Sequence, residues 1–242
     1  MANSSLGAAI LERYERIRSQ IDAAAQSAGR NPAEIKLLVV TKKQPLAVVQ
    51  AVIDAGIRIL GENYPEEAVH KRELLRDENK VEWHMIGHVQ SRKARLVAEH
   101  FALLHSLDSL KLARRLDRFA AEADLVLPVL LEFNVSGEGS KFGWTVSDDA
   151  GLAAVLPEVE EILALRHLAV RGLMTMPPLT PDAEMVRPHF RRLRRLRDDL
   201  AKRYPQAAWD ELSMGTSGDF RVAVEEGATY VRVGQAIVGP RA

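Results

Sequence analysis

Two adjacent lysines, Lys42 and Lys43, close a short apolar run in the stretch LLVVTKKQP. A lysine that is partly desolvated and close to another cation has a lowered pKa, and its neutral amine attacks carbonyl groups. Because side chains alternate along a strand, we expect the two lysines to point to opposite sides and only one to face a site. Apolar residues occupy both faces of the run, so periodicity does not decide which one. The alternative is a pair of solvated lysines at a strand end.

Two stretches near the C-terminus bring hydroxyl groups, glycines and a guanidinium together. Free backbone N–H groups ahead of a helix favour a bound anion, and glycines let the backbone approach it closely. The first stretch, ELSMGTSGDF, ends one apolar run, and the second, YVRVGQAIVG, ends the next. The residues concerned are Ser213, Thr216, Ser217, Arg232, Gly234 and Gln235. Together the two stretches predict a phosphate site.

If the strands close into a barrel, the lysine run of the first strand lies beside the anion-binding loop of the last strand. A reactive amine next to a phosphate site suits a ligand that carries both an aldehyde and a phosphate. Pyridoxal 5′-phosphate fits this description, and a phosphosugar in a Schiff-base aldolase fits it as well.

Eight short apolar or β-branched runs must position these residues. The runs are IKLLVVT, IRILGEN, VEWHMIG, ALLHSLD, VLPVLLEFNV, HLAVRGLMTM, AAWDELSMG and TYVRVGQAIVG. Segments with helical periodicity lie between them, and one precedes them. Apolar residues at helical spacing are Ile10, Tyr14, Ile17, Ile21, Ala24 and Ala28; Leu112, Leu116, Phe119 and Ala123; Leu152, Val155, Val159 and Ile162; Phe190, Leu193, Leu196, Leu200 and Tyr204.

Strands that alternate with helices pair in parallel, because a parallel connection needs a crossover of a dozen or more residues. Several runs are apolar at successive positions, as expected of strands that are covered on both faces. The pattern predicts an α/β fold, a closed (β/α)8 TIM barrel of about 250 residues with an additional N-terminal helix. An open doubly wound sheet is the alternative, but no G-x-G-x-x-G follows the first run.

The composition indicates a globular protein without a strong overall charge. The 242-residue chain is 47% hydrophobic, and its 33 basic residues balance 33 acidic ones, which argues against nucleic acid or an anionic membrane as a partner. The absence of cysteine excludes thiolate metal sites and thiol nucleophiles. No apolar run approaches the roughly 20 residues of a membrane span, and no linker divides the chain. We therefore expect one cytoplasmic domain over residues 1–242.

The motifs of the chain, taken in order, resemble those of a known family. They are VVTKKQP, GENYPEEAVHK, WHMIGHVQSRKAR, FNVSGEGSKFG, GLMTMP, LSMGTSGDF and VRVGQAIVG. Along nearly the whole chain they are similar to the pyridoxal phosphate homeostasis proteins (the YggS/PROSC family). The resemblance implies an alanine-racemase-like barrel without the C-terminal β domain, with pyridoxal 5′-phosphate as cofactor. It also implies a mainly monomeric protein with no established catalytic turnover.

The resemblance further implies roles for individual residues. Lys42 would hold the cofactor as a Schiff base, and Lys43 would lie outside the site. The other implied cofactor-binding residues are Asn63, Ser213, Met214, Gly215, Ser217, Arg232, Gly234 and Gln235. Asn63 and Met214 would lie near the cofactor, Arg232 near its ring or phosphate, and the rest around the phosphate. The implied function is intracellular homeostasis of the cofactor, with pyridoxal phosphate-dependent apo-enzymes as partners.

An amino-acid racemase or decarboxylase that uses the same cofactor is the alternative. Racemisation takes a proton from one face of the substrate and returns it on the other, so a second base opposite the lysine is usual. In the alanine racemases a tyrosine of the extra domain fills that role. Tyr64 is the tyrosine at an expected strand end, and we predict it to be a packing residue of GENYPEE.

Two other features carry no site of their own. His84 and His88 lie four positions apart in a strand-like run, which separates them by roughly 13 Å and excludes chelation of one metal ion. We expect His88 to form a hydrogen bond within its loop rather than to line the site. The arginine-rich stretch RPHFRRLRRLRDDLAKR has apolar residues at helical spacing and is predicted to be a solvated outer helix.

Overall fold

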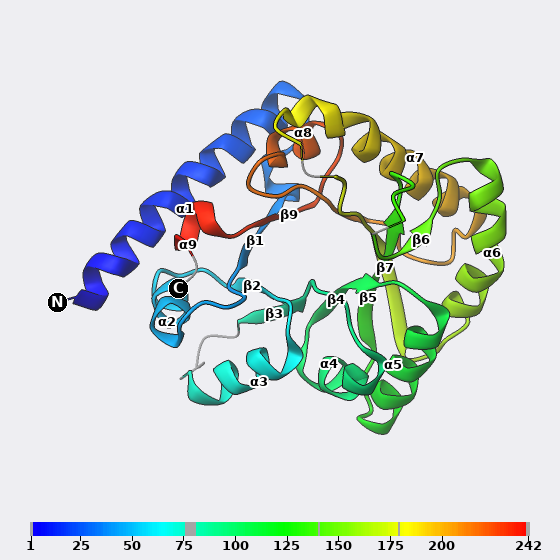
Figure 1. Ribbon diagram of the computed structural model, residues 1–242, viewed down its shortest axis with the longest axis horizontal. Coiled ribbons are helices and arrows are strands. Elements are labelled where there is room, and N and C mark those ends of the chain that lie inside the picture. The colour runs from blue at the N-terminus through cyan, green and yellow to red at the C-terminus, as the bar shows by residue number, and fades with distance from the viewer. Residues whose placement is uncertain (1, 76–80, 140, 179, 241–242) are drawn as a thin grey trace.

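A closed ring of parallel strands forms the centre of the molecule (Figure 1). The structure is a computed structural model that describes residues 2–75, 81–139, 141–178 and 180–240. Within these residues eight strands make the ring, and the pairings β1–β9 and β4–β5 complete it. The strands are β1 (Lys36–Val40), β2 (Ile59–Glu62), β3 (Glu82–Met85), β4 (Leu103–Leu107), β5 (Leu127–Asn134), β7 (Leu168–Met174), β8 (Glu211–Ser213) and β9 (Tyr230–Val233). The predicted (β/α)8 barrel is confirmed.

The composition of the strands explains why they are covered on both faces. In β1, Leu37, Leu38 and Val39 are all buried although their side chains alternate between the two faces. One short strand lies outside the ring: β6 (Trp144–Thr145) pairs in parallel with the end of β5. The sequence pattern gave no indication of β6.

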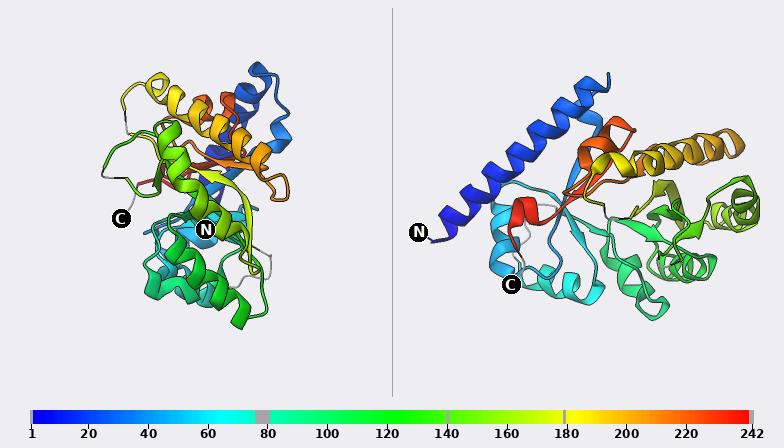
Figure 2. Two further views of the ribbon diagram at one scale, coloured as in Figure 1. Left: turned by 90° about the vertical axis from the view of Figure 1, so that its right-hand side faces the viewer. Right: turned by 45° about the horizontal axis from the view of Figure 1, so that its top comes forward.

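The helices lie on the outside of the barrel, as the two further views show (Figure 2). They are α1 (Ala2–Ser27), α2 (Leu46–Asp54), α3 (Pro65–Leu74), α4 (Ala94–His100), α5 (Leu110–Glu122), α6 (Asp149–Leu163), α7 (Arg187–Arg203), α8 (Phe220–Glu225) and α9 (Gln235–Val238). Short 3-10 turns occupy Pro32–Glu34, Ser91–Lys93 and Ala183–Val186. Side-chain caps begin two of the helices: Ser109 caps α5, and Asp148 accepts a hydrogen bond from the Gly151 N–H at the start of α6.

The predicted apolar stripe of α1 is buried from Ile10 to Ala24, with Tyr14 half-buried. At the end of the stripe the prediction was wrong, because the helix ends at Ser27 and Ala28 beyond it is exposed. Ala25 is buried at the end of the stripe instead. Through this face α1 packs against α2, α8 and α9 (Figure 1).

The arginine-rich stretch forms α7, and its predicted apolar residues are all buried against the barrel. Its arginines are exposed or half-buried, and Arg187 and Arg191 both pair with the buried carboxylate of Glu226 at 3.0 and 2.9 Å. The prediction of a solvated outer helix is therefore confirmed. Among the described residues, none of the helices combines the length and apolarity that a bilayer span requires.

Candidate functional site

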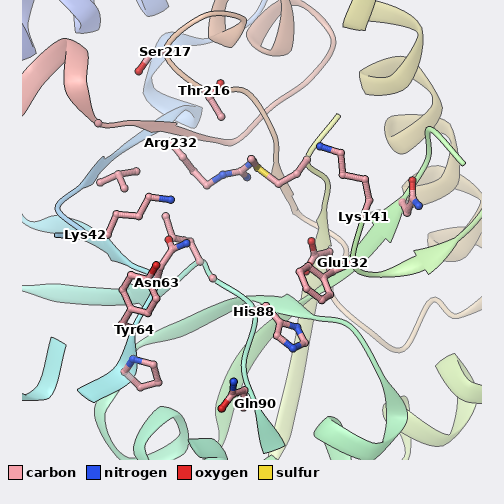
Figure 3. Close-up of a pocket in the computed structure, with 18 of the residues that line it drawn as sticks. Lys42, Asn63, Tyr64, His88, Gln90, Glu132, Lys141, Thr216, Ser217 and Arg232 are labelled. Atoms are coloured by element: carbon pink, nitrogen blue, oxygen red, sulfur yellow. The ribbon is translucent and has the colours of Figure 1, made fainter. Parts of the chain in front are cut away.

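A cavity of about 700 Å³ opens at the carboxyl ends of the barrel strands (Figure 3). This is the face on which barrels of this type carry their sites. Most of the residues that the sequence predicts to bind a cofactor line the cavity: Lys42, Asn63, Ser217, Arg232, Gly234 and Gln235. Arg232 belongs to β9, and the others follow the first, second, seventh and eighth strands of the ring, so the closed barrel brings both ends of the chain together here.

The two lysines of the opening motif separate at a turn. Strand β1 ends at Val40, and the Gln44 N–H donates to the Thr41 carbonyl at 3.1 Å, which closes a β-turn with Lys42 and Lys43 at its centre. Lys42 lines the cavity (Figure 3). Lys43 has a left-handed backbone with φ of 57°, is exposed, and holds its Nζ 5.5 Å from the ring centre of Tyr64. The expected separation occurs, but turn geometry produces it rather than strand alternation.

The loops that follow β8 and β9 form another wall. Thr216, Ser217 and Gln235 line the cavity there. The Asp219 carboxylate accepts hydrogen bonds from the backbone N–H of Thr216 at 2.5 Å and from its hydroxyl at 3.0 Å. The loop is therefore held from within, and helix α8 begins only at Phe220. On the other side of this wall Gly234 caps α9 and Gln235 is its first residue. The wall therefore combines hydroxyl and glycine positions with the start of a short helix, as the sequence predicts.

Three predicted cofactor-binding residues lie behind the wall and do not line the cavity. Ser213 and Met214 are fully buried, and Met214 belongs to the main hydrophobic core. Gly215 has a φ of +93°, and a Cβ there would lie 2.5 Å from the Cβ of Ala223, so only glycine fits. Its carbonyl accepts a hydrogen bond from the Arg232 N–H at 3.0 Å. Whether these residues touch a ligand stays a prediction.

Arg232 reaches into the cavity from β9 although its side chain is almost fully buried (Figure 3). Its guanidinium donates to the Ser213 hydroxyl and, at 3.0 Å, to the Thr175 carbonyl. Burial lowers its pKa to about 10, while the carboxylates of Asp219 and Glu132 act in the opposite direction. Arg232 therefore remains a cation at neutral pH, and its two hydrogen bonds fix the direction of its guanidinium.

A series of polar side chains continues from Arg232 through the interior of the barrel, in which Ser213, His105 and His84 are buried and Glu82 is exposed. The Ser213 hydroxyl lies 2.7 Å from His105 Nδ1, and His105 Nε2 lies 3.0 Å from His84 Nδ1. His84 Nε2 lies 3.4 Å from the carboxylate of Glu82. Burial, with a smaller contribution from the charge of His84, holds the pKa of His105 well below its usual value, so His105 is neutral. The sequence analysis assigned no role to this series of side chains.

Glu132 is a further cavity residue that sequence reasoning missed. It lies across the cavity from Lys42 and is 7% exposed (Figure 3). Its pKa is raised from 4.5 to about 7, mainly by burial and to a smaller extent by the charge of Asp108, while Arg232 acts in the opposite direction. An acidic residue inside the apolar run VLPVLLEFNV was the available signal, because a carboxyl group buried in a strand is seldom structural alone.

The rim of the cavity corrects two expectations. His88 was expected to form a hydrogen bond within its loop, but its Nδ1 lies 2.7 Å from the carboxylate of Asp108, which follows β4, and the residue also lines the cavity. Its ring stacks on Phe142 with centroids 4.1 Å apart. Tyr64 was predicted to be a packing residue, yet it is 41% exposed and lines the cavity mouth. Aromatic rings therefore surround part of the opening.

Asn63 gives direct information about what the cavity accepts. Its side chain lies in the wall near Lys42 (Figure 3). The Oδ1 atom is buried and accepts no hydrogen bond from the part of the chain that the structure describes. Buried polar atoms are nearly always paired in native proteins. An unpaired acceptor at this point indicates a place for a ligand donor.

Fold and cavity define a class: a parallel β/α barrel with a cavity at the carboxyl ends of its strands, whose wall carries a lysine, an arginine and hydroxyl groups. A family model described as alanine racemase, N-terminal domain, matches residues 13–242. The chain is 42% identical to the pyridoxal phosphate homeostasis protein of Pseudomonas aeruginosa over 232 residues, 96% of each chain. It is 41% identical to that of Escherichia coli K12 over 238 residues, 96% of this chain and 97% of the other. The chain belongs to the pyridoxal phosphate homeostasis protein family.

Solved structures agree with this assignment. PipY of Synechococcus elongatus PCC7942 is 37% identical, with TM-scores of 0.83 without PLP and 0.81 with PLP bound, and the match covers 95% of this chain and 100% of that chain. An alanine racemase of Clostridium difficile 630 has a TM-score of 0.69 at 13% identity and is covered over 55% of its length. That likeness concerns the barrel fold alone.

Proposed function

We propose that this protein binds pyridoxal 5′-phosphate through Lys42 and serves the intracellular homeostasis of that cofactor. The observation that carries the proposal is the presence of Lys42, Ser217 and Arg232 in the wall of one cavity, in a chain of this family. A structure of PipY, which shares the fold at 37% identity, has PLP bound. The family resemblance and the cavity chemistry support the same ligand.

The residues of the cavity fit this cofactor. Its aldehyde supplies a carbonyl carbon that forms a Schiff base with a primary amine, and Lys42 is the cavity lysine that the family motif assigns to this bond. Ser217, Gly234 and Gln235 would hold the phosphate, because hydroxyl and backbone groups in glycine-containing loops bind anions closely. The unpaired Oδ1 of Asn63 would accept a donor from the ligand.

Arg232 and the three residues behind it complete the proposed site. Arg232 would contact the ring or the phosphate from its buried position. Ser213 supports Arg232 through a hydrogen bond to its guanidinium, and Gly215 supports it through a hydrogen bond to its backbone N–H. Met214, fully buried, would support the loop through core packing.

We also propose a cytoplasmic, mainly monomeric protein of one domain over residues 1–242 that delivers the cofactor to apo-enzymes without turnover of its own. The absence of cysteine is compatible with a reducing compartment, and the balanced charge argues against an anionic membrane as a partner. The other parts of this proposal rest on the family resemblance. The test of delivery is to mix the loaded protein with an apo-enzyme that needs the cofactor. Activation that is no faster than free dissociation would exclude direct delivery.

The test of binding is spectroscopic and chemical. The protein incubated with pyridoxal 5′-phosphate is expected to turn yellow, to lose the colour on treatment with borohydride, and to carry the label on Lys42. A label on another residue would contradict the proposal. Incubation of the loaded protein with a panel of amino acids, followed by chiral analysis, tests for turnover. Sustained turnover would instead assign an enzyme.

A further inference from the structure

Both peptide groups that flank Lys42 are held by side chains of helix α3. The Thr41 carbonyl accepts a hydrogen bond from Lys71 Nζ at 2.9 Å, and the Lys43 N–H donates to Glu67 Oε1 at 2.7 Å. Lys71 and Glu67 lie one helical turn apart and form an ion pair, with 2.6 Å between Nζ and Oε1. One ion pair therefore holds the backbone immediately before and immediately after Lys42.

Glu62 at the end of β2 extends this arrangement into the barrel. Its Oε1 accepts a hydrogen bond from Lys71 Nζ and another from the Thr41 hydroxyl, both at 2.8 Å. The side chain of Glu62 is fully buried and that of Lys71 is 7% exposed. We refer to Glu62, Glu67 and Lys71 as the α3 clamp. The α3 clamp connects β1, β2 and α3 at the turn that carries Lys42.

Stability alone does not account for the α3 clamp. Removing two charges from water is costly, and apolar packing of the same volume often stabilises a fold as well as a buried ion pair does. Burial raises the pKa of Glu62 above its ordinary value even with the Lys71 ammonium beside it. Unlike apolar packing, hydrogen bonds have direction, so they hold a backbone conformation.

The turn needs such support because of its backbone geometry. Lys43 occupies the third position of the turn with a φ of 57°, a conformation that favours glycine and is unfavourable for lysine. Without the Glu67 acceptor, the peptide between Lys42 and Lys43 is free to rotate towards an ordinary conformation. Such a rotation changes the direction in which Lys42 enters the cavity.

We propose that Lys71 and Glu67 are positioning residues that hold the turn so that Lys42 points at the cofactor. This inference rests on the proposed function, since it concerns the bond between Lys42 and the ligand. Holding a reacting group in its productive orientation is among the larger contributions that a protein makes to bond formation. The α3 clamp is thus expected to affect bond formation at Lys42 and to leave the rest of the ligand site unchanged.

The experiment compares Glu67→Ala and Lys71→Met with Glu73→Ala, an exposed position on the same helix. Two ligands are used: pyridoxal 5′-phosphate, trapped on Lys42 by borohydride, and 4-deoxypyridoxine 5′-phosphate, which has a methyl group in place of the aldehyde. We expect Glu67→Ala and Lys71→Met to slow labelling of Lys42 about tenfold or more, and to change the Kd of the analogue less than about twofold. Glu73→Ala should match the wild type.

Equal weakening of both ligands, or unchanged labelling, would overturn the inference. If Lys71→Met does not fold, Glu67→Ala decides the question. The Glu67 side chain is 27% exposed, and after its removal Lys71 still forms an ion pair with Glu62. Hydrogen exchange of the Lys43 amide in the ligand-free protein is an independent measurement. We expect exchange about tenfold faster in Glu67→Ala, and unchanged exchange would contradict the inference even if no ligand bound to Lys42.

Discussion

Two walls of the cavity are built in opposite ways. The wall that carries Lys42 is held by buried charges, since Glu62 and Lys71 meet under the turn with almost no exposure to solvent. The wall formed by the loops after β8 and β9 consists of hydroxyl groups and glycines. A hydrogen bond from the Thr216 N–H to the Asp219 carboxylate holds the first of these loops. One wall fixes a single side chain, and the other exposes backbone and small polar groups.

The difference follows from what each wall is proposed to bind. A bond to carbon demands a narrow range of directions from one nitrogen, so directional hydrogen bonds around Lys42 are of use. A phosphate is nearly symmetrical and accepts donors from many directions, so it needs close approach more than a fixed side chain. Arg232 combines both properties, because it is a buried cation whose direction is set by Ser213 and Thr175.

The largest effect on cofactor binding is expected from loss of Lys42 itself. We expect Lys42→Ala to abolish the yellow colour and the borohydride label, because the two other lysines of the lining are engaged elsewhere. Lys93 donates to Glu66, and Lys141 donates to the Pro177 carbonyl. Lys43→Ala is the matched control and should keep both, since Lys43 is exposed at the far side of the turn. Absorbance spectra and peptide mapping measure the outcome. Colour retained in Lys42→Ala would show that the lysine is wrongly assigned.

The next largest effect is expected from substitutions in the wall that is proposed to bind the phosphate. We expect Ser217→Ala combined with Arg232→Ala to weaken binding of pyridoxal 5′-phosphate about 300-fold, from about 1 kcal/mol for a hydroxyl and about 2.5 kcal/mol for a charged donor. Pyridoxal, which lacks the phosphate, is the control ligand and should lose much less. Titration of the absorbance gives both dissociation constants. Equal losses for the two ligands would remove the phosphate contact from the proposal.

Glu132 faces both walls, and its titration should appear in the pH dependence of stability. Its pKa is raised from 4.5 to about 7, so folding favours the protonated form. The stability that this contributes is complete below pH about 4.5 and is lost as the pH rises through about 7, a loss of about 3 kcal/mol. We expect Glu132→Gln to abolish this loss.

Urea unfolding between pH about 4.5 and about 8.5 measures the effect of Glu132→Gln. The variant should exceed the wild type in free energy of unfolding mainly above pH about 7, and the two should converge near pH about 4.5. The exposed Glu73→Gln is the control and should follow the wild type throughout. A difference that does not vary with pH would show that Glu132 does not titrate in this range.

The smallest effect concerns the strain in the turn. Lys43→Gly should relieve the left-handed φ of 57° but lose the contact between Lys43 and the Tyr64 ring, for a net stabilisation of about 0.5 kcal/mol. Asp124, with a φ of 53°, is the matched position far from the cavity, and Asp124→Gly tests the backbone effect alone. Thermal or urea unfolding measures both. Destabilisation by Lys43→Gly would show that the ring contact outweighs the strain.

Much of the fold follows from the sequence pattern because it is repetitive. Each apolar run forms a strand, and Leu37, Leu38 and Val39 of the LLVV stretch are buried although their side chains alternate between two faces. The predicted stripe of α7 is buried over its whole length, since a helix that packs on a barrel must bury the same face turn after turn. The prediction for Ala28 was wrong because local geometry sets where a helix ends, and periodicity does not describe that geometry.

The site was less predictable. Lys42, Ser217 and Arg232 stand in the cavity wall as the motifs suggested, because strand ends meet at one face of a barrel. Ser213 and Met214 follow the same motif but lie behind the wall. A motif gives the order of residues along a loop, whereas the direction of each side chain depends on the turn that the loop adopts.

By itself the sequence determined the eight-fold alternation of strands and helices, the family, and the types of group that meet at one end of the barrel. Periodicity left open which of the two lysines faces the site, and only the family resemblance pointed to Lys42. Tertiary structure alone decided that a turn separates Lys42 from Lys43, that α3 holds this turn from thirty positions further along the chain, and that Glu132 is buried opposite Lys42. The physical reason is that alternation and composition are properties of neighbours in sequence. Desolvation and hydrogen-bond direction depend on groups that only the closed barrel brings together.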